Sequence, residues 1–350
     1  MFGSFFLPKF EGNIWSLMGL SDQFGREVDY MRIALTDRCN LRCSYCMPAD
    51  GIQLAPKESI LSFEELILLI EAGARKGIRK LRFTGGEPFV RKDIMTFFER
   101  VSKINGIDSW HITTNGVLLE PHIDKLKDLG IAGINLSLDT LRPDRFQALT
   151  RRDTFSAVKS SYKALLDSGV PTKINVVLMA DFNTDEIRDF CELTKESNLS
   201  IRFIEEMPFN GGSLRASKNP WSAKQISDEI AKIYPNIQFL GRKVSGTSMD
   251  YQLPRANGKI GVIPAFTRSI CGDCNRIRVD AKGGLKNCLY DGGVLDLKTI
   301  LRDSSLQMEQ KCIELGKVLE QTVYKKPKDG FAAQKNSKRK HLQSMSHIGG

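Results

Sequence analysis

Segments with the composition of β-strands alternate with amphipathic helical patterns over the first two thirds of the chain. Ser62, with Glu65 three residues later, is a typical start of the first helix. The predicted strands are residues 31–36, 79–84, 109–114, 133–138, 172–179 and 200–206, and the predicted helices are residues 62–75, 91–103, 120–129, 143–149, 155–168 and 184–196. Strands that alternate with helices predict a parallel sheet with right-handed crossovers. An open doubly wound sheet and a partial (β/α) barrel both fit this pattern.

Polar clusters follow the predicted strands and distinguish these two folds. They are Cys39 to Cys46, Gly85-Gly86-Glu87-Pro88, Thr113-Thr114-Asn115-Gly116, Ser137 with Asp139, and Glu206-Met207-Pro208. Each lies at or just after the carboxyl end of a different strand, and in an α/β barrel the active site is built from many such ends. An open sheet would concentrate its site at one switch point. The sequence therefore predicts an α/β fold whose first part is a partial (β/α)6 barrel of the TIM type.

The alternation stops after Pro208, and this change predicts a second, smaller domain. Residues 210–213 read as a connecting loop and residues 222–233 as a helix, followed by β-like segments at 258–264, 276–280 and 284–288. This pattern indicates an α+β domain. We divide the chain into an extension outside the fold (1–21), a barrel (22–208), a C-terminal domain (209–324) and a basic flexible tail (325–350).

Two sets of three cysteines carry the strongest chemical signal. Cys39, Cys43 and Cys46 form C-x3-C-x2-C, whereas Cys271 and Cys274 form C-x2-C, and thirteen residues separate Cys274 from Cys288. The other two cysteines, Cys191 and Cys312, lie in helical patterns and are expected to be buried thiols. Structural zinc takes four protein ligands, and a [4Fe–4S] cluster normally takes four thiolates. Three thiolates leave one iron open to another ligand, although the second set, taken alone, also allows zinc.

Charge and hydropathy exclude several classes of protein. The formal net charge is +10, but residues 325–340 hold seven basic residues and one acid, so more than half of the excess lies in one short segment. We interpret this run as a mobile tether and expect no nucleic-acid partner. Mean hydropathy is slightly negative, and the lack of a run of about 18 apolar residues argues against a transmembrane helix and a membrane partner.

C-x3-C-x2-C followed by a G-G-E-P turn resembles the signature of radical S-adenosylmethionine (SAM) enzymes. The resemblance implies a partial TIM barrel and a [4Fe–4S] cluster on Cys39, Cys43 and Cys46. In such enzymes the amino and carboxylate groups of SAM chelate the open iron, and one electron from the cluster cleaves SAM to a 5′-deoxyadenosyl radical. In these enzymes the cofactor carries the chemistry, while the protein positions it and excludes water.

The second cysteine set narrows the resemblance to the GTP 3′,8-cyclases of molybdenum cofactor biosynthesis. C-G-D-C-N-R-I-R, Cys288 and a terminal Gly349-Gly350 are similar to that family, as are D-Q-F-G-R near the start, T-T-N-G, and R-F-I-E-E-M-P. The family is a group of lyases that convert GTP to (8S)-3′,8-cyclo-7,8-dihydroguanosine 5′-triphosphate: the radical removes the ribose 3′ hydrogen, and C3′ adds to C8 of guanine. Cys271, Cys274 and Cys288 would hold a second [4Fe–4S] cluster whose open iron binds the guanine.

The resemblance also assigns roles to individual residues. Strand alternation places Arg32 and Arg82 on the face opposite their apolar neighbours, and the forked guanidiniums of Arg276 and Arg278 suit phosphate. The GTP-binding positions are Arg32, Arg82, Thr113, Lys173, Arg276, Ile277 through its backbone, and Arg278. The SAM-binding positions are Tyr45, Gly86, Ser137 and Met207. Arg32, Arg276, Arg278, Gly349 and Gly350 are assigned to catalysis, the two glycines on a tail that reaches the active site.

By the same resemblance, we expect a homodimer, a reductase or a flavodoxin- or ferredoxin-type electron donor, and cyclic pyranopterin monophosphate synthase as the downstream enzyme. A reducing compartment is expected, either the cytoplasm of a prokaryote or the mitochondrial matrix of a eukaryote, because open clusters on thiolates do not suit secretion. Two alternatives remain. One is another two-cluster radical SAM enzyme, such as a peptide-modifying maturase. The other is a zinc-dependent nucleic-acid binder, whose binding would fall steeply with salt.

Overall fold

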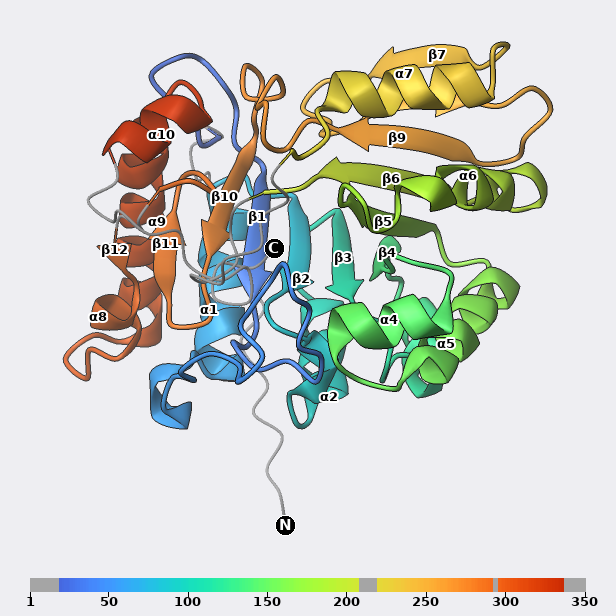
Figure 1. The fold of residues 1–350 in the computed structure, drawn as a ribbon. Coiled ribbons are helices and arrows are strands. Elements are labelled where there is room, and N and C mark those ends of the chain that lie inside the picture. Colours follow the sequence, from blue (N-terminus) through green and yellow to red (C-terminus); the bar gives the residue numbers. More distant parts are fainter. Residues whose placement is uncertain (1–18, 208–218, 292–294, 337–350) are drawn as a thin grey trace.

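The computed structural model describes residues 19–207, 219–291 and 295–336, and its centre is one curved sheet. The six predicted strands form and pair in parallel in the order of the sequence (Figure 1). They are β1 (Tyr30–Ala34), β2 (Lys80–Thr84), β3 (Ser109–Thr114), β4 (Gly133–Ser137), β5 (Thr172–Leu178) and β6 (Ser200–Glu205). The prediction of an α/β fold built on a parallel sheet is confirmed.

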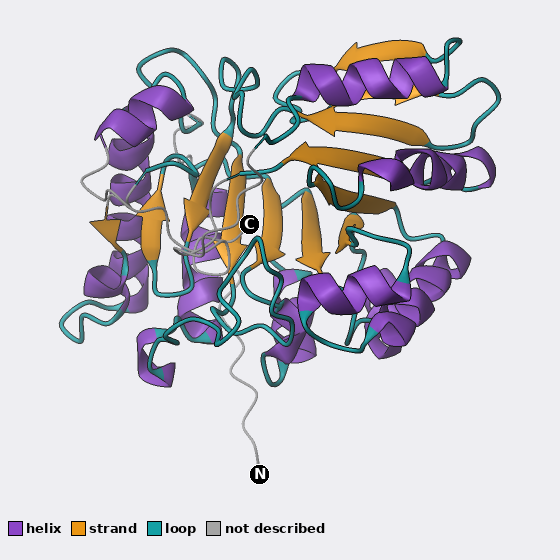
Figure 2. Ribbon diagram, in the orientation of Figure 1, coloured by secondary structure: helices purple, strands orange, loops and turns teal. Residues whose placement is uncertain are grey.

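Helices connect these strands and cover the outside of the sheet (Figure 2). They are α1 (Phe63–Arg75), α2 (Ile94–Val101), α3 (Ile123–Asp128), α4 (Pro143–Thr150), α5 (Phe155–Ser168) and α6 (Ile187–Glu196), with short 3-10 helices η1 (Lys57–Ser59), η2 (Pro88–Val90), η3 (Glu120–His122) and η4 (Thr184–Glu186). The predicted start of the first helix is confirmed, because Ser62 and Glu65 form a capping box. Helix α2 begins three residues later than predicted, because Arg91 is extended after η2 and Asp93 adopts a left-handed conformation, with φ of 58°.

The apolar core lies between the sheet and these helices. Phe83 of β2 packs against Phe97 and Phe98 of α2, with ring centroids 5.3 and 5.5 Å apart, and Phe98 stacks on Trp110 of β3 at 5.4 Å. Arg32 and Arg82 alternate with buried apolar neighbours and line the other face of the sheet. Strand alternation therefore separates an apolar outer face from a polar inner face.

The C-terminal part of the chain extends this same sheet at both edges. Beyond β6 lie β9 (Lys259–Ile263), β8 (Met249–Gln252) and β7 (Gln238–Arg242), while beyond β1 lie β10 (Arg276–Val279), β11 (Gly284–Lys286) and β12 (Leu295–Asp296). The remaining helices are α7 (Ala223–Ile233), α8 (Lys298–Leu301), α9 (Met308–Tyr324) and α10 (Gly330–Asn336). Both edges of the barrel sheet are thus paired, because strands of the smaller C-terminal domain extend that sheet.

Two of the expected boundaries differ from the structure. Leu20 and Ser21 belong to the fold, since Leu20 is buried, its carbonyl accepts from the Val28 amide, and Ser21 bridges to Glu27. The expected flexible tail begins with ordered structure, because Lys326 is buried and α10 follows it. Local composition indicated a solvated run, whereas tertiary contacts bury its first part. Gly349 and Gly350 lie outside the described residues.

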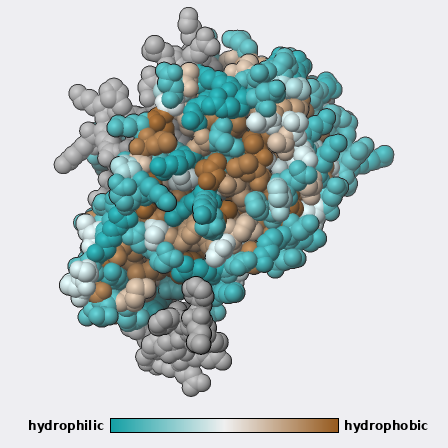
Figure 3. Space-filling view, turned by 90° about the horizontal axis from the view of Figure 1, so that it is seen from below, coloured by the Kyte–Doolittle hydropathy of each residue, from teal (hydrophilic) through white to brown (hydrophobic). Residues whose placement is uncertain are grey.

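The face seen in Figure 3 lies on the side toward which β3 points. Hydrophobic residues gather near its centre, and hydrophilic residues surround them. The carboxyl ends of the parallel strands open toward this side, where α/β barrels carry their sites. Among the described residues, every helix is too short or too polar to span a bilayer.

Candidate active site

A cavity of about 700 Å³ lies against the inner face of the sheet and brings together nearly all of the predicted site residues. It is lined by Arg32, Cys39, Cys43, Tyr45, Cys46, Arg82, Gly86, Thr113, Ser137, Lys173, Met207, Cys271, Cys274, Arg276, Arg278 and Cys288. The side chain of Ile277 is buried in the core on the opposite face, so only its backbone can face this side. Gly349 and Gly350 are not among the described residues.

The first cysteine set lies on the loop that follows β1. The Cys39 sulfur accepts hydrogen bonds from the Leu41 amide at 3.4 Å and from Nδ2 of Asn115 at 3.7 Å. Burial raises the pKa of the Cys39 thiol to about 11 and that of Cys43 well above its usual value. Donors aimed at sulfur are a known means of tuning iron–sulfur ligands, so this donor set fits a cluster.

The G-G-E-P turn holds the loop of the first cysteine set against the end of β3. A Cβ on Gly86 would lie 2.0 Å from the Arg38 carbonyl oxygen, and one on Gly85 would lie 2.4 Å from the Thr36 carbonyl oxygen. The close approach of these backbones therefore requires glycine. The buried Glu87 carboxylate accepts from the Asn115 amide and the Thr114 hydroxyl, both at 2.7 Å, and burial raises its pKa to about 7.

Tyr45 and Met207 reach the cavity from opposite sides. The Tyr45 hydroxyl donates to Oδ2 of Asp139 at 2.8 Å, and Oδ1 of Asp139 accepts from the Val177 amide at 2.7 Å. Burial raises the pKa of Asp139 to about 6. The sulfur of Met207 lies 3.6 Å from the hydroxyl of Tyr290, two residues after Cys288. Met207 therefore lies next to the second cysteine set.

Rows of cations cross the inner face of the sheet between the two cysteine sets. Arg278 of β10, Arg32 of β1 and Arg82 of β2 are register partners, so their side chains share one face. Arg82 donates from Nε to the Tyr30 hydroxyl at 2.6 Å and from Nη1 to the Thr113 hydroxyl at 3.4 Å. Burial, with Arg278 beside it, lowers the pKa of Arg32 well below its usual value. Cations held this close favour a polyanionic ligand.

Several residues that line this part of the cavity were not predicted from the sequence. Lys80 and Arg202 also line the cavity, and so do Tyr30 and Asp250. Their signal was the period of two within each strand, since Arg202 alternates with the buried Ile201 and Phe203 in β6. Counting the described residues alone, the cavity lining holds ten Lys and Arg side chains but two Asp side chains. The site is therefore strongly positive.

The second cysteine set lies at the other end of β1. Cys274 is two residues before β10, which runs parallel to β1, whereas Cys39 is five residues after the end of β1. Cys288 follows β11, which is antiparallel to β10 and returns to the same end. Five strand residues span about 13 Å at 3.3 Å per step, so the cavity runs along β1 from one set to the other.

The electrostatics of the second set differ from those of the first. Burial raises the pKa of Cys274, but Arg276 and Lys326 act against it and bring the value down to about 6. All eight cysteines are described and are free thiols. Within the described ranges, no three His, Cys, Asp or Glu side chains converge on the position of a single metal ion. Cysteines that bind three different irons of one cluster need not converge in that way, so the donors fit a cluster.

A half-barrel with C-x3-C-x2-C after its first strand defines a class of protein, the radical SAM proteins. The Radical SAM superfamily model matches residues 33–194, and the Molybdenum Cofactor Synthesis C model matches residues 199–331. The GTP 3′,8-cyclase of Alkaliphilus metalliredigens is 38% identical, over 95% of this chain and 100% of that protein. That of Moorella thermoacetica is 40% identical, over 84% of this chain and 91% of that protein. The chain belongs to the GTP 3′,8-cyclase family.

Other relatives are longer or more distant. The molybdenum cofactor biosynthesis protein 1 of Drosophila melanogaster is 38% identical over 94% of this chain, which spans 57% of that protein. Streptococcus suis SuiB, solved with its precursor peptide, has a TM-score of 0.60 at 12% identity, over 88% of this chain and 66% of SuiB. That likeness concerns the fold alone. The sequence relatives favour the cyclase over the peptide-modifying alternative.

Proposed function

We propose that this protein is a radical SAM lyase that converts GTP to (8S)-3′,8-cyclo-7,8-dihydroguanosine 5′-triphosphate. The observation that carries the proposal is the single cavity in which two cysteine triplets face each other across a wall of cations. The first cysteine set suits a cluster that generates a radical. The cations between the two sets suit a triphosphate, and the second cysteine set suits a cluster that binds the guanine base. A single nucleotide can occupy all three regions, because binding cavities of 300–1,000 Å³ hold ligands of that size.

Cys39, Cys43 and Cys46 would hold the first [4Fe–4S] cluster, and Cys271, Cys274 and Cys288 the second, whose open iron takes the guanine. When bound, the first cluster and SAM supply the 5′-deoxyadenosyl radical that removes the ribose 3′ hydrogen. Tyr45, Gly86, Ser137 and Met207 bind SAM from four different strand ends. Tyr45 is fixed by its hydrogen bond to Asp139, so its ring is oriented before the cofactor arrives.

Arg32, Arg82, Thr113, Lys173, Arg276, Arg278 and the backbone of Ile277 bind GTP. Guanidiniums at register positions of three adjacent strands can each make forked hydrogen bonds to phosphate oxygens. The strands are rigid and share one sheet, so the triphosphate is held still while the ribose faces the first cluster. Arg32, Arg276 and Arg278, together with Gly349 and Gly350, carry the catalytic role.

Several further proposals follow from membership of the family. The active form is a homodimer, a flavodoxin- or ferredoxin-type protein or a reductase supplies electrons, and cyclic pyranopterin monophosphate synthase takes the product. The protein works in a reducing compartment, the cytoplasm of a prokaryote or the mitochondrial matrix of a eukaryote. The division after residue 208 separates its two functional parts, one for each cluster.

Anaerobic reconstitution with iron and sulfide, followed by SAM, GTP and a reductant, tests the proposal. We expect about eight irons per chain, formation of 5′-deoxyadenosine only when GTP is present, and the cyclised nucleotide as product. GTP labelled with deuterium at C3′ should transfer the label to 5′-deoxyadenosine. Cys191→Ser is the matched control for Cys→Ser changes in either triplet, because Cys191 is a buried helical thiol outside the cavity.

The alternatives predict different results in the same experiment. Two clusters and SAM cleavage without any turnover of GTP would favour a peptide-modifying enzyme. Bound zinc with no cleavage of SAM would refute both radical SAM hypotheses. A cyclised product that carries the 3′ deuterium would contradict the proposed site of hydrogen removal.

A further inference from the structure

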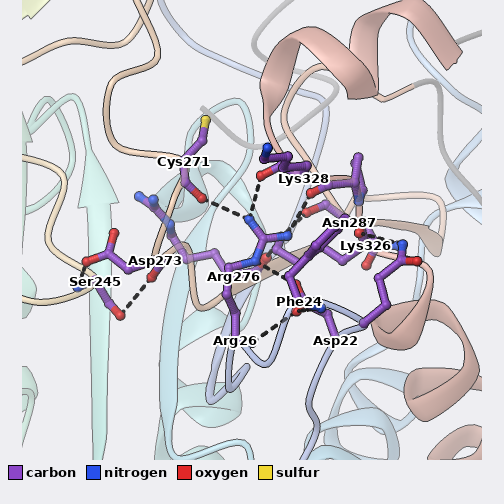
Figure 4. A network of polar contacts seen from close by, with 12 residues as sticks. Asp22, Phe24, Arg26, Ser245, Cys271, Asp273, Arg276, Asn287, Lys326 and Lys328 are labelled. Atoms are coloured by element: carbon purple, nitrogen blue, oxygen red, sulfur yellow. Dashed lines mark hydrogen bonds and ion pairs between the residues drawn. The ribbon is translucent and has the colours of Figure 1, made fainter.

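Two buried cations tie the second cysteine set to the segment that follows α9. Arg26 belongs to the D-Q-F-G-R turn near the start of the described chain, and Lys326 lies just after α9. Figure 4 shows both side chains pointing into one network of backbone carbonyl groups. The proposed function assigns no role to either residue. Their partners, however, are the backbone stretches that carry the three cysteines.

All three nitrogen atoms of the Arg26 guanidinium donate hydrogen bonds. Its Nη1 donates to the carbonyls of Cys271 and Lys328, both at 2.8 Å, and its Nη2 donates to the carbonyl of Pro327 at 2.7 Å. Its Nε donates to Oδ2 of Asp22 at 2.6 Å, and the Asp22 side chain is fully buried. One guanidinium thus joins a ligand residue of the second set to residues 327 and 328.

Lys326 makes the complementary connection. Its buried Nζ donates to the carbonyl of Arg276 at 2.7 Å and to the carbonyl of Asn287. These residues lie two positions after Cys274 and one position before Cys288. The side-chain Nδ2 of Asn287 donates in turn to the Thr322 carbonyl at 2.6 Å, which adds a second tie to α9. Arg26 and Lys326 together fix the backbone next to all three cysteines.

The loop between Cys271 and Cys274 is also held from its other side. Asp273 accepts from the Ser245 amide at 2.7 Å and from Nη1 of Arg242 at 2.8 Å, and both partners lie at the turn between β7 and β8 (Figure 4 includes Ser245 and Asp273). The loop is therefore clamped between two distant parts of the chain. Four residues without regular secondary structure gain a fixed shape in this way.

We infer that Arg26 and Lys326 are positioning residues for the second cluster: they hold Cys271, Cys274 and Cys288 in the arrangement that one cluster requires. The inference rests on the second cluster of the proposed function. Three thiolates of one cluster would have to be held in a fixed arrangement, and these three cysteines come from two separate loops, one before β10 and one after β11. Loss of either cation leaves two or three backbone carbonyls without their charged donor, and that of Asn287 is buried, which favours displacement of a loop.

Arg302 offers a matched control. Its guanidinium also binds a carboxylate, Glu65, at 2.6 Å and two backbone carbonyls, those of Glu58 at 2.8 Å and Ile60 at 3.3 Å. It lies outside the cavity, and no role in the site is assigned to it. Arg302→Met therefore removes the same kind of interaction at a place where no cluster is expected.

The test uses the full chain with Cys39, Cys43 and Cys46 all changed to Ala, so that only the second cluster can assemble. This parent should bind about four irons after reconstitution. We then compare Arg26→Met, Arg26→Lys, Lys326→Met and Arg302→Met, with circular dichroism to establish folding. The readouts are iron per chain, the electron paramagnetic resonance spectrum of the reduced cluster with and without GTP, and the rate at which a chelator removes iron.

We expect Arg26→Met and Lys326→Met to lose iron about tenfold faster than the parent, which corresponds to the loss of one charge-assisted hydrogen bond. Their spectra should broaden, whereas Arg302→Met should match the parent. Arg26→Lys should lose iron at a rate between those of the parent and Arg26→Met, because an ammonium cannot make all the hydrogen bonds of the forked guanidinium. If folded Arg26→Lys and Lys326→Met release iron at the parent's rate, the inference fails and the proposed function stands. If the parent binds no iron, the second cluster and the inference both fail.

Discussion

The affinity of this protein for GTP should fall as pH rises from 7 to 9, because Lys173 loses its proton in that range. Lys173 points inward from β5 and lines the cavity. Burial lowers its pKa to about 8, and the neighbouring cations Arg202, Arg82 and Lys80 act in the same direction. A triphosphate would reverse this effect, since a nearby anion favours the ammonium. GTP binding and protonation of Lys173 are therefore linked.

The size of the effect follows from the two charge states. With a pKa of about 8, Lys173 is charged in about nine molecules of ten at pH 7 and about one in ten at pH 9. If GTP binds only the ammonium form, the dissociation constant rises about tenfold over this range. The dissociation constant must rise with pH, because the charged form of Lys173 prevails below its pKa and is lost above it.

Tyr30 also contributes to the expected fall of GTP affinity with rising pH, and its contribution has to be measured separately from that of Lys173. Burial raises its pKa, but Arg82 and Arg32 oppose this effect, and the net value is about 7. Raising the pH therefore creates a phenolate beside the phosphates, which also weakens binding. Tyr30→Phe removes this contribution while leaving the ring that Lys80 contacts at 5.0 Å.

Equilibrium dialysis of GTP against cluster-loaded protein, without reductant so that no turnover occurs, measures the effect. In the Tyr30→Phe background, the dissociation constant should rise about tenfold from pH 7 to pH 9. In Tyr30→Phe with Lys173→Met it should stay constant and match the high-pH value of the single variant. A double variant that loses affinity as steeply as Tyr30→Phe would refute the assignment of Lys173, and a rise in affinity with pH would refute the linkage itself.

Three other changes test separate parts of the site. Arg202→Met should weaken GTP binding by about ten- to a hundredfold in the same dialysis assay, by the loss of one charge-assisted hydrogen bond, and unchanged SAM binding is the control. Gly86→Ala should lower both SAM affinity and the melting temperature, because its Cβ would meet the Arg38 carbonyl at 2.0 Å; a variant with native values would show that the loops can separate freely. Glu87→Gln places an amide donor among the donors of Thr114 and Asn115, and it should cost about 1–3 kcal/mol in urea unfolding.

The sequence alone predicted the barrel well, because its signals are local. The predicted strand at residues 109–114 and the helix at 155–168 coincide with β3 and α5. Alternation within β1 and β2 placed Arg32 and Arg82 on the inner face. Such alternation can be recognised from neighbouring residues alone, without information on distant parts of the chain. The same local signals place a polar cluster after five of the six predicted strands.

Contacts between distant parts of the chain could not be predicted in this way. Strand β7 is mostly exposed and β12 has two residues, so neither carries an alternating pattern. Lys326 looks like one of a run of solvated lysines, yet it is buried, because the carbonyls of Arg276 and Asn287 accept hydrogen bonds from its ammonium group. Nothing within a few residues of Lys326 specifies those partners. The role of the D-Q-F-G-R turn likewise depends on a distant partner, because Arg26 donates a hydrogen bond to the Cys271 carbonyl.

The pairing of β10 with β1 is the step that turns two separate cysteine motifs into one site. Arg276 lies beside Tyr30 and Arg278 beside Arg32, although about 245 residues separate the two strands. A shift of this register by one residue would turn Arg276 and Arg278 toward the core and bring Ile277 into the cavity. It would also move Cys274 along β1 relative to Cys39. Arg26 and Lys326 bind the carbonyls of Cys271 and Arg276 at the start of β10 and oppose that shift, so the contacts that order the second cysteine set also keep the arginines on the inner face.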